Sequence, residues 1–334
     1  MIFDNNLKEL ISAAFVEEKD VFLCLSTLKG VIYEDEITSV VLLPSAFTGS
    51  GNMPFCNYNE GMPFSALKTD EKTVFCDVRF LADSSFREFL LHKRVGRIII
   101  PFAECADKGE WKYREAFRWT GEFRAECPYF CQVVAIFLSS DTDYDRYREY
   151  FGSEDVIFAG EENRLSINIY EANSSKSKFF CLAALIEKYA YKRICVFFNS
   201  RNEAESFGRF LSARATRYLY INGASNTRDK KNIISRFRAG ETNILLVTTS
   251  FVSEQLFADA DIVFFAGVPF SVSAAARCAD LCRENKLNVV YCNDDIKRNE
   301  KISQSLAEVT GDKEITEKRC KALFDIMNII EKEK

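Results

Sequence analysis

The chain has a single histidine, His92. One histidine excludes a catalytic pair of histidines and a histidine-rich metal site within this chain. The twelve cysteines do not sit in a short, loop-rich chain, because they fall inside apolar runs such as VFLCL and RICVFF. Buried free thiols in a reducing cytoplasm explain them better than disulfides do, so we expect a cytoplasmic protein.

Long apolar runs are also missing, and none approaches the roughly 20 residues that a membrane-spanning helix needs. The start of the chain, MIFDNNLKEL, lacks the basic segment followed by an apolar one that marks a signal peptide. We therefore expect no membrane partner. The net charge is −5, which argues against a general polyanion binder, so that local charge must decide whether nucleic acid is a partner.

A composition of 47% hydrophobic and 28% charged residues is typical of a globular protein. A length of 334 residues is enough for two α/β domains. The most informative stretch is YINGASNTRDKKNIISRFRAGETNILLVTTSF, residues 220–251. It predicts a strand ending at Ile221, a helix that Thr227 caps and Gly240 ends, and a second strand at 244–247.

The second of these strands, ILLV, is a continuous apolar run, as expected of a strand buried on both faces of a parallel sheet. The stretch is thus a βαβ unit. Its loops at 222–225 and 248–251 fall at the carboxyl ends of the strands, which is where open α/β sheets bind ligands.

Positive charge is concentrated around this unit. Between residues 192 and 240 the lysines and arginines stand at 192, 193, 201, 209, 214, 217, 228, 230, 231, 236 and 238, and the acids only at 203, 205 and 229. Such a region suits a groove that follows a phosphate backbone. The alternative is that Arg228, Lys230 and Lys231 form the solvated face of an amphipathic helix.

Short polar groups at strand ends can hold a nucleic-acid backbone together with such cations. The candidate nucleic-acid-binding residues are Arg201, Asn222, Gly223, Arg228, Lys230, Lys231, Arg236, Thr249 and Ser250.

In order and spacing, this stretch resembles the second motor lobe of superfamily-two helicases, and the RecQ family most closely. The turn 222–225 (NGAS) stands where that family has His-Ala-Gly-Leu, and 236–240 (RFRAG) matches its Arg-Phe-x-x-Gly. Residues 247–251 (VTTSF) stand where the family has Ala-Thr-x-Ala-Phe-Gly. The resemblance extends in register over nearly the whole chain, although several signature residues differ.

The resemblance implies an α/β fold of two tandem RecA-like domains of the P-loop NTPase type, with mostly parallel sheets. We expect lobe 1 at residues 1–160, lobe 2 at 161–295 and a short C-terminal helical segment at 296–334. A polar stretch between Gly160 and Ser177 marks the boundary between the lobes.

The same resemblance shows what lobe 1 lacks. Where the family has the phosphate-binding loop Thr-Gly-Gly-Gly-Lys-Ser, this chain has TLKGVI at 27–32, with Val31 in place of the lysine. A phosphate cradle needs bare backbone and a positive charge. Lys29 is a conceivable displaced substitute, but the sequence favours an ordinary loop between a strand and a helix.

The metal-binding segment is altered as well. Where the family has Asp-Glu-Ala-His-Cys, this chain has Pro101 and Phe102 at the two carboxylate positions and Glu104 at the histidine. Asp280 replaces the first arginine of the family's γ-phosphate helix, whereas Arg283 retains the second. Losing the lysine and the metal site removes the electrostatic stabilisation on which phosphoryl transfer depends.

We therefore expect no catalytic residue, no metal and no cofactor. Residual ATP binding stays open at a vestigial nucleotide site, whose residues are Thr27, Lys29, Gly30 and Arg283.

Two further patterns leave alternatives open. The segment after the altered motif carries aromatic and basic residues that either stack on bases or pack in the core: Trp111, Tyr113, Arg114 and Phe117. Two cysteine pairs, 127/131 and 278/282, have metal-like spacing, but without histidine partners they are a weak zinc signal.

Three functions remain in view. The first is a catalytically inactive RecQ-like module that binds DNA or RNA, or acts as a recruiting subunit. The second is a protein-interaction scaffold that keeps the fold and has lost both ligands. The third is an ATP-dependent DNA helicase that takes its missing groups from a partner.

Overall fold

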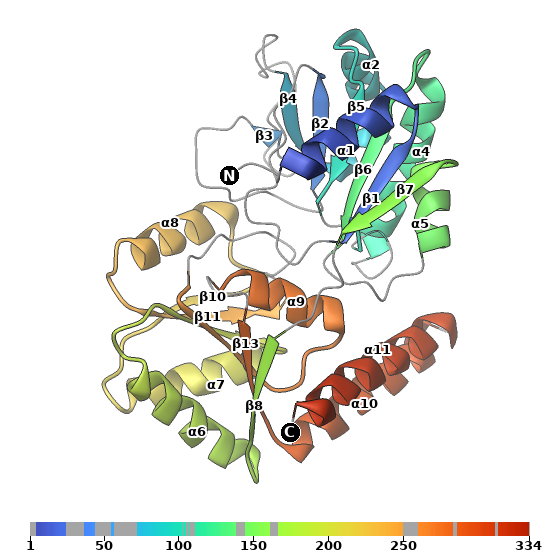
Figure 1. Cartoon of the computed structure of the whole chain (residues 1–334). Coiled ribbons are helices and arrows are strands. Elements are labelled where there is room, and N and C mark those ends of the chain that lie inside the picture. Colours follow the sequence, from blue (N-terminus) through green and yellow to red (C-terminus); the bar gives the residue numbers. More distant parts are fainter. Residues whose placement is uncertain are drawn as a thin grey trace. The chain divides into compact units, whose positions relative to one another are not determined.

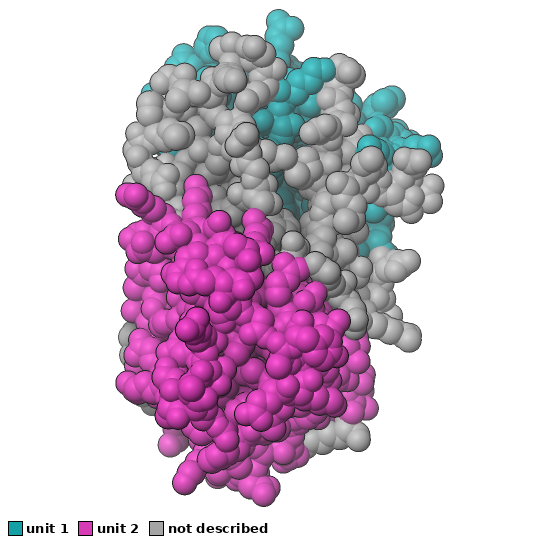
Figure 2. Space-filling model, turned by 90° about the vertical axis from the view of Figure 1, so that its left-hand side faces the viewer, with its two compact units in different colours: residues 1–163 teal, residues 164–334 magenta. Residues whose placement is uncertain are grey.

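The structure is a computed structural model. It describes residues 5–24, 37–43, 55–56, 72–101, 103–104, 106, 111–137, 144–160, 166–249, 260–282, 286–310 and 313–333. The chain divides into two compact units, residues 1–163 and 164–334 (Figure 2).

In the described part of unit 1, seven parallel strands form one sheet in the order β3-β4-β2-β5-β6-β1-β7 (Figure 1). The strands are β1 (Asp20–Cys24), β2 (Ser39–Leu43), β3 (Phe55–Cys56), β4 (Thr73–Asp77), β5 (Arg97–Ile100), β6 (Gln132–Phe137) and β7 (Val156–Gly160). The helices are α1 (Asn5–Val16), α2 (Ser84–His92), α4 (Trp111–Glu126) and α5 (Tyr144–Phe151), with a 3-10 turn η3 at Val78–Ala82.

The core of unit 1 is aromatic. Every residue of β1, β2, β5 and β6 is buried. The Phe22 ring on β1 lies 5.5 Å from that of Phe137 on β6 and 6.1 Å from that of Phe151 on α5. At the start of β1 the buried Asp20 carboxylate lies 2.9 Å from the Arg124 guanidinium, so that the helix α4 is tied to the sheet by a shielded ion pair.

Unit 2 contains, among its described residues, a parallel sheet of six strands in the order β10-β11-β9-β12-β13-β8 (Figure 1). The strands are β8 (Ser166–Glu171), β9 (Ile194–Phe198), β10 (Leu219–Ile221), β11 (Ile244–Thr248), β12 (Ile262–Ala266) and β13 (Lys286–Tyr291). The helices are α6 (Ser175–Lys188), α7 (Arg201–Ser212), α8 (Thr227–Arg238), α9 (Val272–Asp280), α10 (Asn293–Thr310) and α11 (Lys313–Lys332).

The α/β class with parallel sheets, predicted from the sequence, is confirmed. The strand β11 is wholly buried, as its apolar run indicates. Gly240 adopts φ = 76° directly after α8, a backbone conformation that favours glycine at the end of a helix. The predicted cap of α8 is wrong by one residue, because the Asn226 side chain accepts the Asp229 N–H, and Thr227 is the first helical residue.

Two strands that flank the boundary between the units, β7 and β8, were not predicted. Among the described residues they are edge strands, since β7 pairs with β1 and β8 with β13, and much of each remains exposed. The sequence of β8 (SINIYE) lies in the polar stretch predicted as the boundary, whereas β7 (VIFAG) is a short apolar run directly before it. The predicted C-terminal segment consists of α10 and α11, and both fall within unit 2. No helix among the described residues combines the length and the apolar character needed to cross a bilayer.

Candidate nucleic-acid interface

The sheet of unit 2 has a topological switch point between β9 and β12. The helix α7 leads from β9 to β10 on one side, whereas α9 leads from β12 to β13 on the other. Because crossovers between parallel strands are right-handed, α7 and α9 cover opposite faces of the sheet. Open α/β sheets bind ligands outside the carboxyl ends of the strands at such a point.

Polar residues follow several strands at this edge. Asn199 and Ser200 come directly after β9, Asn222 after β10, and Thr249 after β11. The Ser200 hydroxyl accepts the Glu203 N–H and caps α7. The sequence prediction that the polar loops of the βαβ unit share one edge of the sheet agrees with this register, since β10 pairs with β11 and β11 with β9.

The turn after β10 is held by its own hydrogen bonds. The Asn222 Oδ1 atom accepts the Ala224 N–H at 2.8 Å, and the Asn222 carbonyl accepts the Ser225 N–H at 3.1 Å. The Ser225 hydroxyl in turn accepts the Asn222 N–H at 3.3 Å. Gly223 and Ala224 are exposed at the tip. The turn is thus preorganised and presents bare backbone to solvent.

Exposed cations stand close to this edge. Arg201 opens α7, and Arg228 and Lys231 lie in the first turns of α8; all three are exposed. These helices begin where β9 and β10 end, so the three cations belong to the carboxyl edge of the sheet.

Two other predicted cations are placed differently. Lys230 is 5% exposed, so the alternative that it lies on the solvated face of α8 does not hold, and its role as a nucleic-acid contact stays a prediction. Arg236 forms an ion pair with Glu241 at the end of α8. It lies nine residues beyond Thr227, about 14 Å along the helix axis and therefore away from the strand ends.

Of the remaining predicted residues, one lies in the part of the chain that the structure describes and the others do not. Thr249 is half-buried at the end of β11. Ser250 and all four residues of the vestigial nucleotide site, Thr27, Lys29, Gly30 and Arg283, lie outside the described residues.

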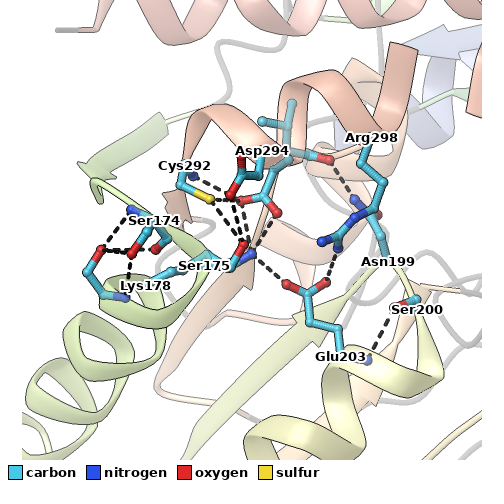
Figure 3. A network of polar contacts seen from close by, with 12 residues as sticks. Ser174, Ser175, Lys178, Asn199, Ser200, Glu203, Cys292, Asp294 and Arg298 are labelled. Atoms are coloured by element: carbon cyan, nitrogen blue, oxygen red, sulfur yellow. Dashed lines mark hydrogen bonds and ion pairs between the residues drawn. The ribbon is translucent and has the colours of Figure 1, made fainter. Parts of the chain in front are cut away.

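A buried ion network lies beside the same edge and was not predicted (Figure 3). Lys178 on α6 is 0% exposed. Its Nζ atom lies 2.5 Å from Glu203 Oε1 on α7, and 2.7 Å and 2.9 Å from the two carboxylate oxygens of Asp295 on α10. The three donors of the ammonium group are therefore matched by three acceptors. Arg298 adds a second cation, 3.3 Å from the other oxygen of Glu203.

The network fixes the loops that follow β9, β12 and β13. Asp295 Oδ2 accepts the backbone N–H of Cys292, directly after β13, at 2.9 Å. The amides of Asn199 and Asn299 both donate to the Val268 carbonyl after β12, at 2.8 Å and 2.9 Å. Gly267 has φ = 121°, which a side chain would strain. One cluster thus sets the position of three strand ends.

A sequence signal for Lys178 exists. The residues at i+4, i+7 and i+8 on α6 are Leu182, Leu185 and Ile186, all buried, so the lysine stands on the apolar stripe of its helix. A lysine there needs a buried acid. The sequence does not say which acid, because the partners lie 25 and 117 residues away.

In unit 1 the segment after β5 is turned into the core. Pro101 and Glu104 are buried, and Ala103 donates its N–H to the Ile136 carbonyl of β6 at 3.1 Å. The Tyr147 hydroxyl donates to the Glu104 carbonyl at 3.4 Å. The described residues of this segment therefore present no carboxylate to solvent.

For one residue of the aromatic segment after β5, the structure decides between base stacking and core packing. Phe117 is 0% exposed, and its ring packs edge-on against Phe151 at 6.3 Å, as a core residue does. The side chains of Trp111, Tyr113 and Arg114 lie outside the described residues.

The two cysteine pairs are free thiols in the structure. Within the described part of the chain, no group of three or more histidine, cysteine or acidic side chains is arranged to hold a metal ion. Cys127 and Cys131 interact with each other. The hydrogen bond from Cys131, supported by the charge of Arg124, lowers the pKa of the Cys127 thiol, whereas the same bond and burial raise the pKa of Cys131.

Comparison with known proteins agrees with this architecture. Residues 177–280 match the model of the helicase conserved C-terminal domain. No curated protein matches the chain.

Several solved structures share the fold. The DEAD-box helicase Mss116 bound to ssRNA and UDP-BeF is 11% identical with a TM-score of 0.65, over 89% of this chain and 71% of that one. The DUF1998 helicase MrfA bound to DNA and AMPPNP is 12% identical with a TM-score of 0.62, over 87% and 49%. The Mycobacterium smegmatis helicase Lhr bound to ssDNA and AMP-PNP is 13% identical with a TM-score of 0.58, over 88% and 42%.

The chain therefore has the fold of a superfamily-two helicase core, with two tandem RecA-like domains. It spans half or less of the length of MrfA and Lhr.

Proposed function

We propose that this protein is a catalytically inactive, RecQ-like helicase-fold module of the cytoplasm that binds single-stranded DNA or RNA. The binding surface is the carboxyl edge of the sheet in unit 2. Its role is that of a recruiting subunit, which holds a nucleic acid and a protein partner without using ATP.

The observation that carries the proposal is the arrangement at this edge. Exposed Arg201, Arg228 and Lys231 stand beside the preorganised turn that begins at Asn222. Arginine and lysine side chains donate hydrogen bonds to phosphate oxygens. Three solved structures with the same fold are bound to ssRNA, DNA or ssDNA, which supports this class of ligand.

The proposed loss of ATPase activity is inferred from the residues that stand where the family has its catalytic groups. Pro101 stands where the family has its metal-binding Asp, and Val31 where it has its lysine. The buried Glu104 offers no accessible carboxylate in their place. These residues do not fit a complex of Mg²⁺ with a nucleoside triphosphate.

The first experiment is fluorescence anisotropy of labelled single-stranded DNA and RNA against the pure protein, at about 50 and about 200 mM salt. We expect micromolar binding that weakens at the higher salt. The double variant R228E/K231E should bind at least tenfold more weakly, because two phosphate contacts become repulsive.

The control is Arg236→Glu, which reverses one positive charge on the same helix but at its far end. It should bind like the natural protein. Absence of binding at the lower salt, or an equal loss in R236E, would show that the carboxyl edge is not the site.

The second candidate function is a protein-interaction scaffold without a nucleic-acid ligand. The net charge of −5 and the exposed aromatic side chains of unit 2 favour it. It would be adopted if neither oligonucleotide binds. An ATP-dependent helicase, the third candidate, would instead show stimulated ATP hydrolysis that disappears in Arg283→Ala.

A further inference from the structure

An aromatic patch lies on the helical layer formed by α6 and α7. We define it as Phe179, Phe180, Phe210 and Arg214. Phe180 is 47% exposed, which is a large exposed fraction for this residue type, and Arg214 is exposed as well. Phe179 and Phe210 are half-buried and pack against the core of unit 2.

The rings are held in a fixed arrangement. The Phe180 and Phe210 centroids lie 5.1 Å apart at an interplanar angle of 86°. The Phe179 ring lies 5.9 Å from Phe210, and Phe207 beneath them is fully buried. Edge-to-face packing of this kind is favourable and fixes the exposed ring of Phe180 against a rigid base. The core of unit 2 therefore extends to the surface at this patch.

Arg214 covers the same rings. Its Cζ atom lies 5.1 Å from the Phe210 centroid and 5.5 Å from that of Phe180. Among the described residues no acidic group pairs with it. A guanidinium stacked on two rings keeps its N–H donors at the rim, where a carboxylate can accept two of them in parallel.

The surrounding charge is mainly positive. Lys176 lies one turn before Phe180 on α6, and Arg209 precedes Phe210 on α7; both are exposed, as is one acid, Glu205, a turn before Arg209. The acid on the same stripe of α6, Glu187, is two turns further along the helix. The patch thus combines an apolar centre with a cationic rim in a protein whose net charge is −5.

We propose that the aromatic patch docks an acidic segment of a partner protein that carries an aromatic or large aliphatic side chain. This side chain packs on Phe180, and a neighbouring carboxylate pairs with Arg214. An apolar anchor ringed by charged contacts is the usual form of a small protein interface. A polypeptide fits better than a nucleic acid, because the rings already face one another or Arg214 and leave no paired platform for successive bases.

The site is independent of the proposed nucleic-acid edge. The helices α6 and α7 cover one face of the sheet, whereas α8, with Arg228 and Lys231, belongs to a crossover in the opposite direction on the other face. If one proposal fails, the other is not affected, because peptide binding tests the aromatic patch and oligonucleotide binding tests the edge of the sheet.

The test is selection of short random peptides displayed on phage against the full chain, with counter-selection against the double variant F180S/R214E. We expect enriched peptides that combine acidic residues with an aromatic or large aliphatic one. Synthetic labelled copies should bind Phe180→Ser and Arg214→Glu at least about tenfold more weakly than the natural chain, as truncation of an interface anchor does.

Tyr191→Ser is the matched control. Tyr191 is an exposed aromatic residue with Lys192 over its ring, just after the other end of α6. The control should leave peptide binding unchanged. Phe180→Ser and Arg214→Glu lose contacts with Phe210, so a small drop in melting temperature is expected, and circular dichroism at the assay temperature should show that all variants are folded.

Three outcomes would overturn the proposal: no enriched peptides, enriched peptides without acidic residues, or equal loss in Y191S. A labelled single-stranded oligonucleotide is titrated in parallel. Unchanged oligonucleotide affinity in F180S supports a polypeptide partner, whereas a tenfold loss would assign the patch to nucleic acid and reject the polypeptide.

Discussion

Lys178 and Lys176 stand two residues apart near the start of α6, yet they differ completely in environment. Lys178 is 0% exposed between two carboxylates, whereas Lys176 is exposed to solvent. Removing the buried cation leaves Asp295 without its cation and Glu203 with only the partly exposed Arg298, which is far more costly than losing a solvated lysine. The pair therefore isolates the effect of burial from that of charge.

We expect Lys178→Met to lower the free energy of unfolding by about 3–5 kcal/mol. Lys176→Met should change it by less than about 0.5 kcal/mol. Urea denaturation followed by circular dichroism measures both. The triple variant K178M/E203Q/D295N should recover part of the loss, since no carboxylate is then left without its cation. Equal stability of K178M and K176M would disprove the role given to the network.

Cys127 offers a second prediction at the scale of a residue. The hydrogen bond from Cys131, with the charge of Arg124, lowers the pKa of its thiol below the ordinary value of 9.0. The thiolate is the reactive form, so its fraction rises as the pH passes the pKa. A lowered pKa thus moves alkylation to lower pH.

Alkylation of Cys127 by iodoacetamide, followed by mass spectrometry against pH, should therefore have its midpoint below that of an ordinary thiol. Cys131→Ala removes the donor and should move the midpoint upward. Cys181→Ala is the control, because Cys181 lies on α6 in the other unit and burial alone raises the pKa of its thiol. A midpoint that does not move in C131A would show that the hydrogen bond has no influence.

At the scale of an element, α8 illustrates what the sequence can and cannot predict. Its start, its end and its buried face at Ile234 and Phe237 follow from periodicity and from Gly240. The burial of Lys230 was missed, although Ile234 and Phe237 stand four and seven residues further along the helix and place it on the same face. Its position between the exposed Arg228 and Lys231 hid this periodicity.

The cap of α8 yields a test of the structural assignment. Asn226→Ala removes the acceptor for the Asp229 N–H and should lower the free energy of unfolding by about 1 kcal/mol. Urea denaturation measures it. Asn232→Ala, an exposed change within the same helix, should have little effect or a slightly favourable one. A loss in N232A as large as in N226A would contradict the capping role.

The same helix gives a prediction about binding. In the salt dependence of oligonucleotide affinity, Arg228→Ala should reduce the slope of log K against log salt by about 0.7, the value for one phosphate contact on a single strand. Arg236→Ala should leave the slope unchanged, since its guanidinium pairs with Glu241. A slope that changes only in R236A would place the strand at the opposite end of the helix.

Most of the fold was accessible from the sequence because buried parallel strands such as β9 and β11 are continuous apolar runs. The edge strands β7 and β8 were not predicted, since the half-exposed β8 has mixed polarity and resembles a linker, and β7 is a short apolar run just before that stretch. The candidate site divides in the same way. Strand ends and nearby cations are local features, whereas the contacts of Lys178 join segments that only the folded sheet brings together.

At the scale of the whole molecule, both proposed binding sites belong to one of the two units. All residues proposed to bind nucleic acid or peptide lie in unit 2, which has its own sheet and its own buried core. A domain with its own core can in principle fold alone.

We therefore expect the fragment 164–334 to fold by itself and to bind oligonucleotide with the same sensitivity to R228E/K231E. Cooperative urea unfolding and anisotropy measure these two properties. The fragment carrying Lys178→Met is the control for specific folding and should lose stability as the full chain does. Non-cooperative unfolding of the unchanged fragment would show that unit 1 is needed for its fold.

The pairing of Lys178 with Asp295 also has a consequence during translation. The lysine leaves the ribosome 117 residues before its bidentate partner, and β8 leaves well before β13, the strand with which it pairs. Until residue 291 has been made, β8 lacks the strand with which it pairs, and until residue 295 has been made, the charge on α6 has only part of its compensation. Unit 2 therefore completes its fold only after residue 295, and a chain that terminates just before α10 would bury Lys178 with Glu203 but without Asp295.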